Sequence, residues 1–335
     1  MRMRTTVSIA ALLLAALLAA PAQGKLVYVK QADTASPVVY VATDKGKHPR
    51  RLGIGRAPAI SPDGRWVAFI TANEAGTRDT LVLKRLKQGS QRFVMRSKRI
   101  ASLRFSPDSA RIAAIANSRR IRVYDITKDK RRAAASGDIR GYSWAPDSER
   151  VVYGEAEGED FQADSDLYVA RAMGGADPDR LTRSKDAVNP VWGPAEIFFD
   201  RFTRRDADAP AYNLFAVDPA TRDVRRLTDL TIPALVSGLV PLEVSSDSRR
   251  MLAVFTGQDT EVGFTVNTRS GDTRVLSTDF ERGIVGYDLS TDGKTILGHT
   301  GGPDPNNAHD VITLPYAGGE ETVLVENAAY PDWTR

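Results

Sequence analysis

Carboxylates are the side chains of this 335-residue chain that have both the number and the spacing to do chemistry. Asp and Glu together number 42, against three histidines and no cysteine. The absence of cysteine excludes disulfides, thiolate metal sites and a cysteine nucleophile. His48 stands in a polar turn before Pro49. His299 and His309 flank a loop rich in glycine, proline and asparagine and could act as acid–base groups, although neither has a close second ligand in the sequence.

Several aspartates lie in long polar segments, often at alternate positions. Oxygen-rich loops of this kind can hold Ca²⁺, but none has the spacing of an EF-hand. We therefore predict no metal and no cofactor, and interpret the acids as solvated loop residues that could also form a binding surface. The candidate binding residues are Asp164, Asp166, Asp200, Asp206, Asp208, Asp304 and His309.

Sequence motifs of catalysis are missing. There is no Gly-x-Ser-x-Gly elbow, no Walker loop and no dinucleotide-binding glycine fingerprint. We predict no catalytic residues and expect the chain not to be an enzyme.

A short repeat provides the elements that must position these residues. The phrase Ser-Pro-Asp-Gly at 61–64, followed by an apolar strand, returns in altered form along the chain. Its aspartates stand at 63, 108, 147, 247 and 292, so the period is about 45 residues. Proline fixes φ in the turn and Asp bonds its own backbone, which predicts a hairpin rather than a catalytic site.

Each repeat continues with a third and a fourth strand, as expected for a propeller blade. The predicted third strands are 80–86, 121–126, 166–172, 212–218, 262–268 and 311–316. One predicted blade lacks its first strand and consists of residues 25–30, 37–43 and 50–52. Residues 328–333 are predicted to be a first strand with no second strand after it. Joining them closes a ring and removes its exposed sheet edges. We predict an all-β propeller of four-stranded antiparallel blades, seven in number, with six as the alternative.

The N-terminus has the three parts of a secretory signal. Met1–Arg4 is basic, residues 7–20 are apolar except for Ser8, and Ala20-Pro21-Ala22 is a small-x-small cleavage site. About 20 apolar residues are needed to span a bilayer, and this stretch is shorter. We expect a signal peptide at 1–22 and a single exported domain at 23–335 with no membrane span.

The overall charge is nearly balanced, but its distribution is uneven. Without the two arginines of the first 22 residues, 44 basic residues face 42 acidic ones. We therefore expect no nucleic-acid partner. Residues 84–140 hold 17 basic and four acidic residues, and 149–166 hold seven acids and one Arg. This asymmetry marks either a partner surface or solvated strand faces and loops.

The repeat resembles that of the TolB-type propeller family. Residues 38–44, 50–52 and 61–70 carry the resemblance best, with echoes at 166–169 and 180–182. It implies a periplasmic location and binding to an envelope protein such as the peptidoglycan-associated lipoprotein. TolB has a six-bladed propeller behind an N-terminal α/β domain, whereas the repeats here begin directly after the signal.

Two functions from different classes remain open. The first is a monomeric periplasmic binding or scaffolding propeller that receives a partner on its long-loop face and central funnel. The long loops are 71–79, 155–165, 200–211 and 299–310. The alternative is a secreted hydrolase or lyase that acts on a glycan or peptide through Asp164, Asp166 and Asp206 with His309. Two carboxyl groups about 5–9 Å apart in the funnel would favour the alternative.

Overall fold

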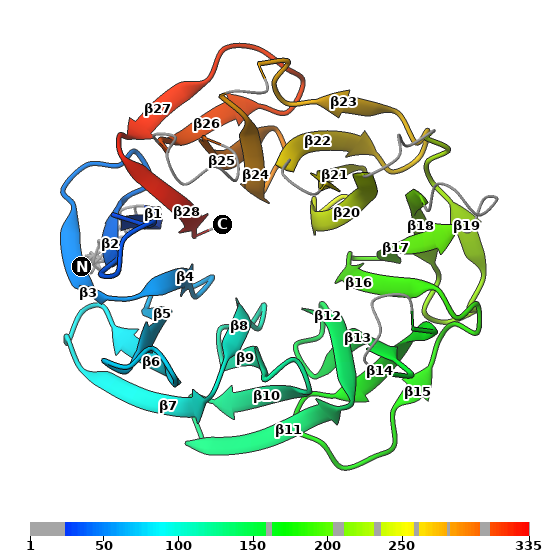
Figure 1. The fold of residues 1–335 in the computed structure, drawn as a ribbon, viewed down its shortest axis with the longest axis horizontal. Coiled ribbons are helices and arrows are strands. Elements are labelled where there is room, and N and C mark those ends of the chain that lie inside the picture. Colours follow the sequence, from blue (N-terminus) through cyan, green and yellow to red (C-terminus); the bar gives the residue numbers. More distant parts are fainter. Residues whose placement is uncertain are drawn as a thin grey trace, which may run out of the picture.

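The computed structural model describes residues 24–158, 163–203, 211–230, 236–257, 261–279, 282–301 and 309–334. The expected signal peptide at 1–22 lies outside these residues. In the described part of the chain no helix is long and apolar enough to cross a membrane. The described residues form strands β1 to β28, which are arranged around a ring (Figure 1).

The strands form seven blades of four, named here from the inner strand outwards. Blade 1 is β28 (Ala328–Trp333), β1 (Lys25–Lys30), β2 (Val38–Thr43) and β3 (Arg50–Ile54). Blade 2 is β4 (Arg56–Ile60), β5 (Trp66–Ala72), β6 (Asp79–Arg85) and β7 (Gln91–Ser97). Blade 3 is β8 (Ile100–Phe105), β9 (Arg111–Ala116), β10 (Arg120–Asp125) and β11 (Lys130–Ser136). Blade 4 is β12 (Asp138–Trp144), β13 (Arg150–Ala156), β14 (Ser165–Arg171) and β15 (Asp179–Arg180).

The remaining blades follow the same order. Blade 5 is β16 (Ala187–Trp192), β17 (Ile197–Thr203), β18 (Ala211–Val217) and β19 (Val224–Arg226). Blade 6 is β20 (Val236–Val244), β21 (Arg250–Gly257), β22 (Glu261–Asn267) and β23 (Thr273–Val275). Blade 7 is β24 (Ile284–Leu289), β25 (Thr295–Thr300), β26 (Val311–Pro315) and β27 (Thr322–Val325). Blades 5 and 6 also touch through one parallel bridge between Tyr212 and Gly238. Each predicted third strand begins within one residue of the observed one.

The repeated turn joins the inner strand to the second strand, as its chemistry predicts. The Ser61 hydroxyl donates to Asp63 (2.6 Å) and accepts from the Trp66 amide (2.9 Å). The next position has a left-handed φ of 64° at Gly64 and 63° at Ser109. Glycine adopts this conformation freely, whereas serine is strained there. The Ser109 hydroxyl accepts from the amide of Asp63, so it also ties blade 3 to blade 2 (3.0 Å).

The ring is closed by β28, which pairs with β1 antiparallel although the two strands come from opposite ends of the chain. The buried apolar residues form seven clusters, and each cluster lies between two adjacent blades. One of them joins blade 7 to blade 1 through Leu26, Tyr28 and Leu297. The predicted propeller of seven blades is therefore confirmed, and the alternative of six is wrong.

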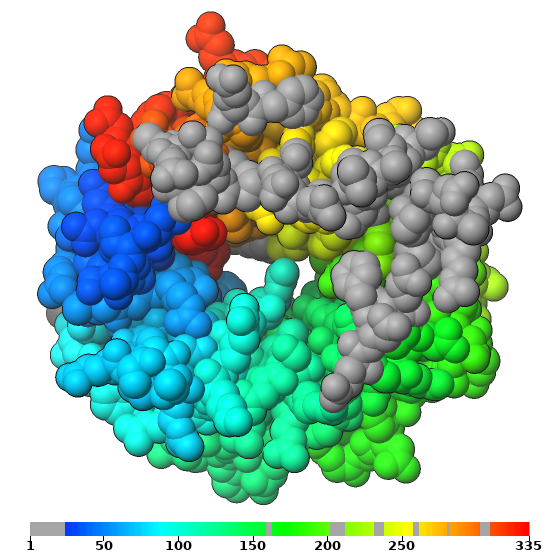
Figure 2. Space-filling view, viewed as in Figure 1, coloured from blue at the N-terminus to red at the C-terminus, as the bar shows by residue number. Residues whose placement is uncertain are grey.

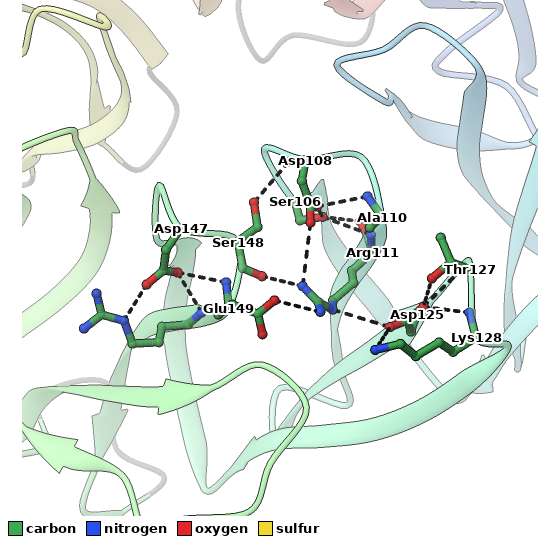
Figure 3. A network of polar contacts seen from close by, with 11 residues as sticks. Ser106, Asp108, Ala110, Arg111, Asp125, Thr127, Lys128, Asp147, Ser148 and Glu149 are labelled. Carbon is green, nitrogen blue, oxygen red and sulfur yellow. Dashed lines mark hydrogen bonds and ion pairs between the residues drawn. The ribbon is translucent and has the colours of Figure 1, made fainter.

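The buried side chain of Arg111 links two blades (Figure 3). The guanidinium of Arg111 in blade 3 donates to the Ser148 carbonyl (2.8 Å) and to Glu149 (2.9 Å) of the turn in blade 4. It also lies 3.6 Å from the carboxylate of Asp125, which is 1% exposed. Burial opposes ionisation of Asp125, but hydrogen bonds from Thr127 and Lys128 and the charge of Arg111 lower its pKa. The group is therefore a charged clamp between two blades.

Candidate functional site

The inner strands surround a central opening (Figure 2), and every one of them is interrupted by a β-bulge. In five inner strands the bulge holds a residue with positive φ. These residues are Ala57, Ser102, Gly141, Asn189 and Tyr330. Bulges re-aim side chains and are frequent beside active sites. Positive φ is uncommon for residues other than glycine, and four of these five residues are not glycine.

Two histidines and two tyrosines meet at the junction of blades 7 and 1. The Tyr287 hydroxyl lies 3.0 Å from Nε2 of His299. The His299 and His309 rings stand edge to face, with centroids 5.0 Å apart. Tyr330 of the closing strand stands edge-on to His299 (5.4 Å). His309 Nε2 lies 3.3 Å from Asp33, which belongs to the β1–β2 connection. Both histidines are buried, whereas Tyr330 is 41% exposed.

The hydrogen bonds of this cluster fix where its protons lie. Nδ1 of both histidines is 2.8 Å from the Thr300 carbonyl, which can only accept, so both Nδ1 atoms carry hydrogen. Nε2 of His299 is then the acceptor of the Tyr287 hydroxyl. Nε2 of His309 lies 3.3 Å from a carboxylate oxygen of Asp33. The cluster therefore places one buried imidazole beside a tyrosine hydroxyl and a second beside a carboxylate.

The buried imidazole of His299 makes stability depend on pH. Burial, together with the charge of His309, lowers its pKa from 6.5 to about 4. Because the folded-state pKa lies below the unfolded one, the stabilisation is complete above pH 6.5 and is lost as the pH falls through about 4. We expect the free energy of unfolding to fall by about 3 kcal/mol over this range from His299 alone.

The measurement is denaturant unfolding across that pH range for the wild type, His299→Gln and His48→Asn. His48 is exposed and has positive φ, which asparagine tolerates, so its variant is the matched control. The free energy of unfolding of His299→Gln should depend less steeply on pH than that of the wild type. The control His48→Asn should keep the wild-type slope. Parallel curves for all three proteins would contradict the assignment.

Asp200 lies inside blade 5 rather than in a loop. It belongs to β17, is 1% exposed, and accepts one hydrogen bond from the side chain of Asn189 (3.2 Å). Its other oxygen, Oδ1, is buried without a hydrogen-bond partner among the residues described. Burial raises the pKa of Asp200 well above its usual 3.8. Its charge is one reason, after burial, that the pKa of Tyr212 rises to about 12.

Asp166 joins strand β14 to the outer strand of blade 4 and to the segment that leads into blade 5. It is the second residue of β14, is buried, and accepts from the Thr182 hydroxyl (2.6 Å) and the Arg180 guanidinium. Polar side chains near the start of the third strand make similar contacts in blades 2 and 5. Asp79 accepts from the Ile100 amide (2.7 Å), and Asn213 accepts from the Leu230 amide (2.9 Å). These side chains fix the connection from one blade to the next.

The other candidate residues are spread around the ring. Asp164 is half-buried and pairs with Lys185 (2.9 Å), which follows blade 4 in the chain. Blade 4 and the blade of His309 lie on opposite sides of the ring (Figure 1), so the structure does not bring Asp164 and Asp166 to His309. Asp206, Asp208 and Asp304 lie outside the residues described.

Sequence reasoning missed Asp33, Tyr287 and Tyr330. Predicted closure of the ring was the available signal, because it places the connection after 25–30 beside the blade of His309. For the described ranges, no group of three or more His, Asp or Glu side chains is arranged to hold a metal.

No protein-family model and no curated protein sequence matches the chain. Solved structures do match. The β-propeller domain of the Trilobed protease from Pyrococcus furiosus is 14% identical with a TM-score of 0.68, over 90% of this chain and 92% of that one. TolB from Acinetobacter baumannii is 14% identical with a TM-score of 0.54, over 93% of this chain and 66% of that one. An oligogalacturonate lyase from Vibrio parahaemolyticus is 14% identical with a TM-score of 0.61, over 91% of this chain and 87% of that one.

The fold is a TolB-like β-propeller. The chain spans 66% of the length of the matched TolB. The expectation that the chain is not an enzyme is contradicted, because structures with this fold include oligogalacturonate lyases and prolyl and acylaminoacyl peptidases as well as TolB. At 13–14% identity these likenesses establish the fold alone, and a missing sequence motif is not evidence against catalysis on this scaffold.

Proposed function

We propose that this chain is an exported periplasmic propeller that binds a protein of the cell envelope at the long-loop mouth of its central channel. Tyr330 carries the proposal. It stands near the start of β28, where the amide of Ala328 donates to the His309 carbonyl of the β25–β26 connection (2.7 Å). The signal-like N-terminus and the TolB-like fold support export and the envelope location.

Tyr330 has the properties of an anchor residue in a protein interface. It is 41% exposed although it belongs to an inner strand, and its φ is 51°. Tyr287 and His299 stand edge-on against it, with centroids 6.3 Å and 5.4 Å away, so its ring is held in place before a partner arrives. Tyrosine is enriched among the few residues that dominate binding energy, and a rigid side chain loses little entropy on binding.

The test combines cell fractionation with capture. The tagged full chain is returned to its own host, cross-linked in the envelope, and compared with Tyr330→Asn and Val224→Ala. Asparagine tolerates positive φ, so Tyr330→Asn removes the ring without adding strain. Val224 is 45% exposed on the outer strand of blade 5 and serves as the control.

We expect to recover the chain from the periplasm and to capture the peptidoglycan-associated lipoprotein or another identified envelope protein. The amount of captured partner should fall at least about tenfold in Tyr330→Asn and stay unchanged in Val224→Ala. Cytoplasmic recovery, or equal capture by the two variants, would contradict the proposal.

A second candidate function is cleavage of a glycan or peptide, by hydrolysis or by elimination, at the same mouth of the central channel. The observation that favours it is the Tyr287–His299 hydrogen bond, a pair able to move a proton, beside the His309–Asp33 contact. Turnover of polygalacturonate, glycosides and peptides would be assayed with the wild type, Tyr287→Phe and His299→Gln. Activity that both variants lose supports this function. If both variants keep the activity, the reaction takes place at another site.

A further inference from the structure

The outer wall of the propeller carries a groove of about 530 Å³ between blades 2 and 3. Strand β7 forms one side, and β10 and β11 form the other. The residues that carry the argument are Phe93, Arg96, Arg120, Arg122, Tyr124 and Arg132. The volume is within the range of about 300–1,000 Å³ typical of ligand sites. Strands β7, β10 and β11, which line the groove, lie toward the periphery of the ring, away from the inner strands (Figure 1).

The groove has positive charge that the described residues leave uncompensated. None of Arg96, Arg120, Arg122 and Arg132 forms an ion pair with a described carboxylate, and Arg132 donates only to the neighbouring Arg131 carbonyl (3.0 Å). The acids of the same hairpin are engaged elsewhere. Asp125 pairs with Arg111 and Lys128, and Asp129 accepts from the Tyr124 hydroxyl (2.8 Å). A ligand for this groove therefore brings negative charge.

Apolar surface lies among the arginines. Phe93 is 53% exposed although it stands within a strand. Tyr124 is buried among the lining residues, and the Arg131 guanidinium lies over its ring (5.4 Å). A ligand that meets both the arginines and Phe93 carries carboxylates and apolar groups together.

The spacing of the arginines favours a polypeptide. Side chains at alternate positions of a strand share one face, so Arg120 and Arg122 point the same way as Tyr124 and lie about 6.6 Å apart along β10. Alternate side chains of an extended peptide repeat at the same distance. Carboxylates at alternate positions of the peptide would therefore lie opposite the two guanidinium groups. Each carboxylate can accept two parallel hydrogen bonds from one guanidinium. We propose that this groove binds an extended segment of another protein that has acidic residues alternating with apolar ones.

The test uses two labelled hexapeptides of equal composition, Glu-Leu-Glu-Leu-Glu-Leu and Glu-Glu-Glu-Leu-Leu-Leu, titrated with the full chain and followed by fluorescence anisotropy. Arg120→Gln/Arg122→Gln removes the paired charges from the groove. Arg249→Gln/Arg269→Gln is the matched control, because both residues are exposed in blade 6 and the change in net charge is the same. Thermal melting of both variants verifies that the ring is intact.

We expect the alternating peptide to bind more tightly than the blocked one. Its affinity should fall at least about tenfold in the groove variant, since charge-assisted hydrogen bonds are lost, and stay unchanged in the control. Equal affinity for the two peptides, or equal weakening in both variants, would overturn the proposal. Tighter binding of polygalacturonate or of phosphatidylglycerol vesicles would overturn it too, because the groove would then select a glycan or a lipid surface.

Discussion

Replacing Arg111 by methionine lowers the free energy of unfolding by about 3–5 kcal/mol, the cost expected when a buried ion pair loses one partner. The Arg111 side chain is 8% exposed and that of Asp125 is 2% exposed. Methionine fills similar space but leaves the Asp125 carboxylate buried without its guanidinium. It also leaves the Ser148 carbonyl without the donor that ties blade 4 to blade 3.

The repeat itself provides the control for this experiment. Arg150 occupies the equivalent position after the turn of the next blade and pairs with Asp147, but its side chain is 50% exposed. Exposed pairs contribute about 0–1 kcal/mol, so Arg150→Met should change stability by no more than that. The measurement is urea unfolding of both variants and of Arg111→Met/Asp125→Asn, which should recover part of the loss because the buried charge is gone. Equal losses for Arg111→Met and Arg150→Met would show that the buried clamp has no special weight.

Deleting residues 328–335 opens the ring and exposes a strand edge. Strand β28 pairs with β1 and covers the cluster between blades 7 and 1, where Ala328 and Ala329 are at most 2% exposed. The Thr334 hydroxyl and amide also bond to the backbone of Lys25 (both 2.9 Å). Without this strand, β1 has an unpaired edge, and such edges pair with other chains. We expect species larger than the full chain in size-exclusion chromatography, and a return to the elution volume of the full chain when a synthetic peptide of residues 328–335 is added.

A point substitution tests the same closure in the full chain. Ala329→Asp places a charge in the apolar contact and should lower the free energy of unfolding by at least about 3 kcal/mol. Val323→Asp adds the same charge on β27 at a site that is 42% exposed, and should leave the melting temperature nearly unchanged. A truncated chain that elutes and melts like the full chain, or rescue by a scrambled peptide, would refute the role of β28.

Short-range chemistry allowed the architecture to be predicted from the sequence. The turn residues at 61–64 and their repeats set a period of about 45, and apolar runs rich in β-branched residues marked the strands. Residues 25–30, 37–43 and 50–52 supplied only three strands of a blade. The sequence offered 328–333 as the missing strand. These inferences succeeded because turns and strands depend mainly on neighbours in the chain.

The candidate site depended on contacts between blades, which a single repeat does not encode. Asp166 begins a predicted strand and Asp200 begins a predicted loop, but the sequence of one repeat does not show that both side chains are buried, as they are in the structure. His309 gains its carboxylate from Asp33, which is distant in the chain and is brought near only when the ring closes.

Burial was likewise decided by tertiary packing. Arg111 and Arg150 follow the same turn phrase, but the neighbouring blade covers the first and leaves half of the second in solvent. The sequence by itself therefore determined the blades and their closure, because these follow from local turn and strand chemistry. Only the tertiary structure decided which of the repeated polar residues are buried, which are paired with a charge and which are free to bind a partner. Solvent access and charge pairing depend on contacts with the adjacent blade.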